Sequence, residues 1–83
     1  MIYDIVFSET ALSQLKKLDK KTQERIIAVL ERIRVRPEAH LRKLVNDPGY
    51  RLRVGDYRVI ADLDNMLLLV LVIKIGHRKN IYG

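Results

Sequence analysis

The spacing of apolar residues changes its period once along this chain, at Asp47-Pro48-Gly49. Before this turn signal, apolar side chains recur every three or four positions, as they do along one face of a helix. After it they alternate with polar residues, as they do in a strand with one buried face. Because neither pattern suits the other structure, the sequence predicts an α+β fold with its helices before its main strands.

The first half contains one predicted strand, residues 2–7, and two predicted helices. Ser8 is a good N-cap for a helix over residues 9–18, and Asp19 is one for a second helix over residues 20–35. Each helix carries one apolar stripe. The short link between them predicts an antiparallel helix pair.

Pro37 ends the second helix. The residues that follow, 39–46, are ambiguous, and one helical turn around Leu41 and Leu44 fits them best.

The second half predicts a three-stranded antiparallel meander that forms one sheet packed on the helices. The strands cover residues 50–54, 57–63 and 66–75. Gly55-Asp56 and Asp64-Asn65 form the two-residue turns, and a glycine in the first position favours type II′. The third strand is apolar on both sides and therefore interior, and Gly76 ends it. We expect residues 1–83 to form one domain.

Composition excludes several classes of protein. The chain has no cysteine, so disulfides, thiolate zinc sites and a cysteine nucleophile are excluded. His40 and His77 are isolated, and we expect neither a metal site nor a cofactor. The longest apolar run is too short to span a bilayer, and the N-terminus lacks signal-peptide features, so we expect a cytoplasmic protein away from membranes. A net charge of +6 leaves a polyanionic partner open.

The register of the first hairpin sorts the charged side chains by face. With Gly55-Asp56 as the turn, Arg53 lies opposite Arg58 and Arg51 lies opposite Ile60. Two arginines directly opposite each other repel, and a locally unfavourable choice is typical of functional sites. This outer face, which also carries Asp62, is either a solvated surface or a seat for an anion.

The second hairpin extends this outer face. With Asp64-Asn65 as the turn, Leu71 is expected opposite Arg58, and Leu67, Leu69 and Ile73 share the arginine face. Exposed leucines indicate a docking surface for another chain. The C-terminal tail or residues 37–49 could cover them instead.

The two motifs YRLRVGDYRVI (50–60) and GHRKNIY (76–82) resemble those of the RelE toxins in the RelE/ParE superfamily of toxin–antitoxin modules. The resemblance extends over nearly the whole chain. It implies a metal-independent endoribonuclease that enters the ribosomal A site and cuts mRNA there. It also implies a RelB-like antitoxin that wraps the toxin in a hetero-oligomer.

The resemblance assigns roles residue by residue. Arg58, Arg78 and Tyr82 match catalytic positions: the arginines would hold the phosphate or the leaving group, and the tyrosine would stack on or orient the substrate. Arg51 falls where the best-known members have one lysine of a catalytic pair, and the other lysine position falls near Gly49.

The resemblance also implies RNA-binding and antitoxin-binding residues, which position and charge select. Arg51, Arg53, His77 and Lys79 are expected to bind RNA, and Ile60, Leu67 and Leu69 to bind the antitoxin. A guanidinium is a poor base, so the general base stays open among Tyr82, Lys79 and His77.

Three functions remain open at this point. The first is a ribosome-dependent mRNA endonuclease, which Tyr82 together with Arg58 and Arg78 favours. The second is a ParE-like poison of DNA gyrase, since such toxins carry similar GDYR and HR signatures. The third is a toxin relic that binds an antitoxin and acts as a co-repressor.

Overall fold

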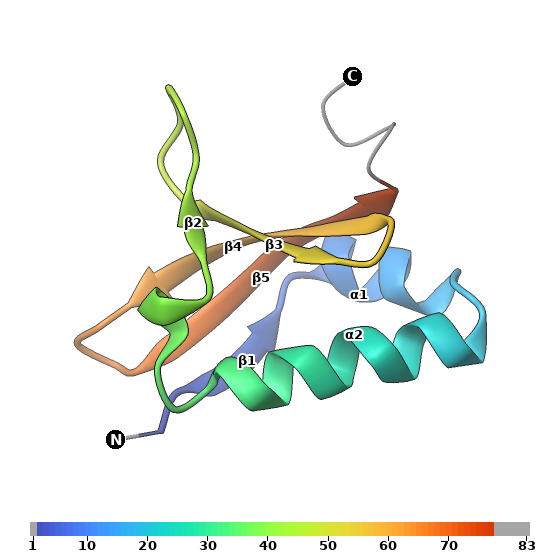
Figure 1. The fold of residues 1–83 in the computed structure, drawn as a ribbon, viewed down its shortest axis with the longest axis horizontal. Coiled ribbons are helices and arrows are strands. Elements are labelled where there is room, and N and C mark those ends of the chain that lie inside the picture. Colours follow the sequence, from blue (N-terminus) through green and yellow to red (C-terminus); the bar gives the residue numbers. More distant parts are fainter. Residues whose placement is uncertain (1, 78–83) are drawn as a thin grey trace.

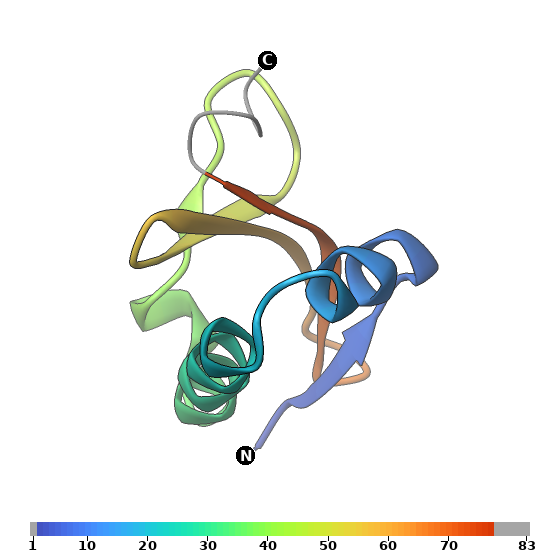
Figure 2. The same cartoon turned by 90° about the vertical axis from the view of Figure 1, so that its right-hand side faces the viewer.

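The fold is a two-layer α+β arrangement in which one sheet lies over two helices (Figure 1). The structure, a computed structural model, describes residues 2–77. Figure 2, turned by a quarter, shows both helices on the same side of the sheet. The elements in chain order are β1 (Asp4–Phe7), α1 (Glu9–Lys16), α2 (Lys20–Ile33), the 3₁₀ turn η1 (Pro37–Ala39), β2 (Arg42–Lys43), β3 (Tyr50–Val54), β4 (Tyr57–Asp64) and β5 (Leu69–His77). The predicted fold class is confirmed.

The sheet has five strands in the order β1-β5-β4-β3-β2. β1 pairs with β5 in parallel, and the other neighbours are antiparallel. β5 therefore lies inside the sheet, as its apolar run predicts. Neither helix within residues 2–77 is long and apolar enough to cross a membrane.

Both predicted helix caps are present. The Ser8 side chain accepts a hydrogen bond from the Ala11 N–H at 3.0 Å, and Asp19 accepts one from the Thr22 N–H at 3.3 Å. A hydrogen bond from the Thr22 hydroxyl to the carboxylate of Asp19 lowers the pKa of that carboxyl group. Each helix ends two residues before its predicted end, because the last turn tightens into hydrogen bonds between residues three apart, such as Leu18 N–H to Leu15 O at 3.1 Å.

The helical turn predicted around Leu41 and Leu44 is wrong. The turn forms earlier, as η1, and Arg42 and Lys43 pair instead with β3 as a two-residue strand. The physical reason is that β3 would otherwise present an open edge, and Leu41 is buried in the core where the chain runs beside that edge.

The core lies between the sheet and the helix pair. Helix α2 supplies Ile26, Leu30 and Ile33, each at most 1% exposed, and α1 supplies Ala11 and Leu15. The sheet faces them with alternate residues of its strands: Leu52, Val54, Val59, Val72 and Ile75.

The first hairpin has the predicted register. Val54 pairs with Tyr57, Arg53 with Arg58 and Arg51 with Ile60. Gly55 has a φ of 60° while Asp56 does not have a positive φ, as a type II′ turn requires. A Cβ on Gly55 would also lie 3.1 Å from Nη1 of Arg25, so helix α2 packs directly over this turn.

The predicted register of the second hairpin is wrong. The connection comprises residues 65–68 rather than two residues, and β5 starts at Leu69 opposite Asp64. Asp64 Oδ1 accepts hydrogen bonds from the N–H groups of Met66 and Leu67 at 3.0 and 2.9 Å, which holds the wider turn.

An irregularity in β5 shifts the register once more. Ala61 pairs with Val72 but Ile60 pairs with Lys74, so Ile73 is an extra residue in the ladder. Arg58 then lies opposite Gly76, not Leu71. Gly76 does not end the strand as predicted, because β5 continues to His77.

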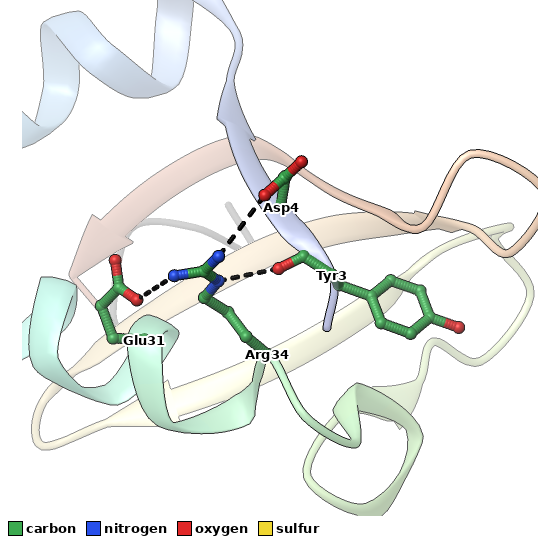
Figure 3. A network of polar contacts seen from close by, with 4 residues as sticks. All are labelled: Tyr3, Asp4, Glu31 and Arg34. Atoms are coloured by element: carbon green, nitrogen blue, oxygen red, sulfur yellow. Dashed lines mark hydrogen bonds and ion pairs between the residues drawn. The ribbon is translucent and has the colours of Figure 1, made fainter. Parts of the chain in front are cut away.

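A polar network fixes the edge strand β1 to the end of α2 (Figure 3). Nε of Arg34 donates to the carbonyl of Tyr3 at 2.7 Å, and its other nitrogens contact Glu31 at 2.6 Å and Asp4 at 3.4 Å. The hydrogen bond with Glu31 raises the pKa of Arg34 above its ordinary value. This network holds β1 in line with β5, where it has only one neighbouring strand.

The packing of α2 predicts a large loss of stability at one isoleucine and a small loss at its neighbour. Ile26→Ala should lower the free energy of unfolding by about 2–5 kcal/mol, because Ile26 is fully buried and its loss leaves a cavity. Ile27→Ala, at a position 43% exposed, should cost well under about 1 kcal/mol. Urea unfolding followed by circular dichroism measures both. Equal losses would contradict this placement of α2.

Candidate active site

Four arginines lie on the outer face of the sheet, which is the face away from the helices. Residues directly opposite in an antiparallel pair share a face, and Arg42 lies opposite Arg51 while Arg53 lies opposite Arg58. Leu52, between Arg51 and Arg53, points into the core, so the alternation of β3 places both arginines outward. Strands β2, β3 and β4 thus each contribute to one cationic cluster.

These four arginines line one pocket of about 420 Å³ together with His40 and Leu52. No acidic side chain contributes to its wall among residues 2–77. The Nε atom of Arg58 is buried, while Arg42, Arg53 and His40 are exposed at the rim. The pocket therefore has a partly buried cation and exposed basic side chains around it.

A cluster of guanidinium groups in one pocket is suited to a phosphate. Planar guanidinium forks match phosphate oxygens in a bidentate way and carry charge at every physiological pH. Arg53 and Arg58 repel each other across the hairpin, and a bound anion would relieve that repulsion. The predicted anion seat thus has a concave shape as well as a charge.

Strand β5 shapes the same region from the other side of β4. Gly76 lies opposite Arg58, so no side chain of β5 competes with Arg58 for space there. Lys74 lies opposite Ile60 and adds a further exposed cation to the face.

Sequence reasoning missed three residues of this region: His40, Arg42 and Lys74. Arg42 and His40 fall in the segment whose conformation was ambiguous, so nothing indicated that they would reach the hairpin. Lys74 reaches the outer face only through the register shift at Ile73. Nothing in the residue pattern indicated the pairing of β2 with β3 or the register shift at Ile73.

The structure places the predicted residue His77 on the opposite side of the sheet from the arginines. His77 lies opposite Tyr57, and the two rings meet edge to face with centroids 5.4 Å apart. Tyr57 packs against the core. Arg78, Lys79 and Tyr82 lie outside the described residues.

The other half of the outer face carries leucines beside aspartates. Leu69 and Leu71 lie opposite Asp64 and Asp62, and Val6 of β1 lies beside Leu71. Leu67 sits in the turn before β5 and is 68% exposed. Residues 37–49, one predicted cover for these leucines, instead add β2 at the far edge of the sheet.

Comparison with protein families shows to which family this chain belongs. The model for the ParE toxin of the type II toxin–antitoxin system, parDE, matches residues 5–82. The chain belongs to the RelE/ParE toxin superfamily. No curated protein sequence gives a match.

Solved structures of superfamily members have the same fold. The RelBE2 toxin–antitoxin complex of Mycobacterium tuberculosis contains a chain with a TM-score of 0.86 at 21% identity, over 94% of this chain and 100% of that one. The intact RelBE complex of E. coli gives 0.76 at 30% identity, over 90% and 95%. The isolated E. coli RelE toxin gives 0.78 at 28% identity, over 96% and 90%.

The arginine cluster of this RelE/ParE toxin predicts specific stabilisation by phosphate. At tenfold above its Kd, bound phosphate would add about 1.4 kcal/mol to the free energy of unfolding. Arg53→Gln should remove most of this gain while slightly raising stability without phosphate, because the repulsion with Arg58 is lost.

Thermal unfolding in phosphate and in chloride at matched ionic strength measures the effect. Arg32→Gln, at an exposed position near the end of α2, is the control and should keep the full gain. Equal gains in both variants would show that phosphate acts on the whole surface rather than in the pocket.

Proposed function

We propose that this type II toxin is a ribosome-dependent endoribonuclease that cuts mRNA in the A site. The observation that carries the proposal is the pocket on the outer face, where Arg42, Arg51, Arg53 and Arg58 converge. The resemblance of the two sequence motifs to RelE, and the 30% identity to the chain in the E. coli RelBE complex, support the same activity.

The chemistry of RNA cleavage explains why arginines suit this pocket. The 2′-hydroxyl attacks the neighbouring phosphorus, and a pentacoordinate phosphorane with extra negative charge forms before the 5′-oxygen leaves. Cations already held in place stabilise that charge without reorganising at the moment of reaction. Arg58 is central among them, since its Nε atom is buried and the residue lines the pocket.

A RelB-like antitoxin is the proposed partner. The related E. coli toxin has been solved in complex with its antitoxin. The outer face of this chain offers such a partner apolar contacts at Leu67, Leu69 and Ile60, next to a cationic pocket that acidic residues would neutralise. An amphipathic helix or an added strand would fit this surface.

A second function, poisoning of DNA gyrase, is kept because the matching family model is that of ParE toxins. One experiment separates the two activities. Purified toxin is added to translating ribosomes, and primer extension maps the mRNA ends. A cut inside the A-site codon supports cleavage, whereas uncut mRNA together with stabilised gyrase–DNA cleavage complexes supports the second function.

The site assignment predicts that Arg58→Ala abolishes toxicity in cells. Losing one charge contact to the phosphorane should cost about 3 kcal/mol in the transition state, or roughly a hundredfold in rate. Growth after induction and single-turnover cleavage on ribosomes measure the effect. Arg32→Ala, on the exposed side of α2, is the control and should remain toxic. A folded Arg58→Ala protein with full toxicity would exclude Arg58 from the site.

The proposed antitoxin surface predicts that Leu67→Asp weakens antitoxin binding by tenfold or more. Leu67 is 68% exposed in its turn, so the substitution should leave the fold intact. Val45→Asp, in the loop before β3 and 83% exposed, is a matched control. Calorimetric titration with the cognate antitoxin measures both affinities. If neither substitution changed the affinity, the antitoxin would have to bind another surface of the toxin.

A further inference from the structure

His40 lines the arginine pocket, and the cleavage reaction proposed above assigns it no role. Cleavage through the 2′-hydroxyl needs a group that removes its proton. We propose that His40 is this general base. The inference rests on the proposed ribonuclease function and identifies the residue that starts the reaction.

The local structure directs His40 toward the pocket. His40 ends the turn η1, where its N–H donates to Pro37 O at 3.0 Å, and it stands two residues before Arg42. Leu41 between them is buried in the core, 6% exposed. The side chains on either side of Leu41 therefore point outward. Continuing the β2–β3 register from Arg42 places His40 beside Arg53.

Among the lining residues that the structure describes, His40 is the one suited to accept a proton. The described lining consists of four arginines, Leu52 and His40. Guanidinium groups stay protonated up to about pH 12, so they can hold a phosphate but cannot take a proton. Imidazole gains and loses a proton near neutral pH, which suits general base catalysis.

The imidazole of His40 does not stabilise the part of the fold that the structure describes. Its side chain is exposed, and its imidazole makes no hydrogen bond or ion pair with the rest of residues 2–77. The acidic residue of the same turn, Glu38, instead lies 3.1 Å from the hydroxyl of Tyr3. Replacing His40 should therefore leave the fold unchanged.

The proposed step conserves every atom and charge. His40 takes the proton of the 2′-hydroxyl while the 2′-oxygen bonds to phosphorus. The bond from phosphorus to the 5′-oxygen breaks, and that oxygen takes a proton from water. The products are a 2′,3′-cyclic phosphate and a 5′-hydroxyl, and the imidazolium returns its proton to solvent. The charged groups facing His40 are Arg42, Arg51, Arg53 and Arg58.

The test compares single-turnover cleavage of ribosome-bound mRNA by the wild type and His40→Gln across a range of pH. Glutamine can still form hydrogen bonds but cannot accept the proton. We expect a rate loss of about a hundredfold or more, with ribosome binding within about threefold of wild type. The wild-type rate should rise with pH as the general base loses its proton, and the variant should lose this dependence.

Two further variants complete the test. Imidazole added to His40→Ala should restore at least about tenfold in rate, which a merely structural role would not allow. Lys43→Gln, in the same short strand but on the other face from Arg42, is the control and should cleave normally.

The outcomes separate this inference from the proposed function. Wild-type cleavage with a His40→Gln rate and pH dependence like the wild type's would overturn the role of His40 and leave the ribonuclease function standing. Failure of imidazole to rescue His40→Ala would also overturn it. Absence of any cleavage by the wild type would overturn both.

Discussion

The rest of the structure depends on the burial of one face of the sheet against the helix pair. Burying Leu52, Val54 and Val59 fixes the register of the first hairpin, because a slip of one residue would drive arginines into the core. Gly55 supports the same register through a turn over which Arg25 packs. Arg53 and Arg58 thus point outward because the alternate residues of their strands are buried in the core. No further interaction is needed to orient them.

The outer face created in this way divides into two regions with different chemistry. Its β2–β3 side, with the first residues of β4, carries the arginine pocket. The side formed by β1, β5 and the end of β4 carries leucines together with Asp62 and Asp64. One surface can therefore hold a phosphate at one end and an apolar protein segment at the other. An antitoxin that spans both regions would block the pocket by occupying the face rather than by changing the fold.

The sequence predicted the elements whose signals are local: the helix caps at Ser8 and Asp19, the Gly55 turn and the arginines of β3 and β4. The prediction from sequence failed where contacts between distant parts of the chain determine the register or the conformation. The apolar run of β5 has no alternation to fix its register, so the four-residue turn and the extra residue Ile73 were missed. Within residues 39–46 only Arg42 and Lys43 form a strand, because the edge of β3 is available there, and His40 and Arg42 were missed for this reason. Tyr82 and Arg78 remain predictions.

The central claim is that the outer-face arginines hold the phosphate of the RNA being cut. The most direct measurement is the NMR signal of each arginine Nε–H group as a 2′-O-methyl RNA trinucleotide, which cannot be cleaved, is added to the toxin. We expect shifts that saturate together for Arg51, Arg53 and Arg58, with little change for Arg32 and Arg36. Shifts confined to arginines outside the pocket would contradict it.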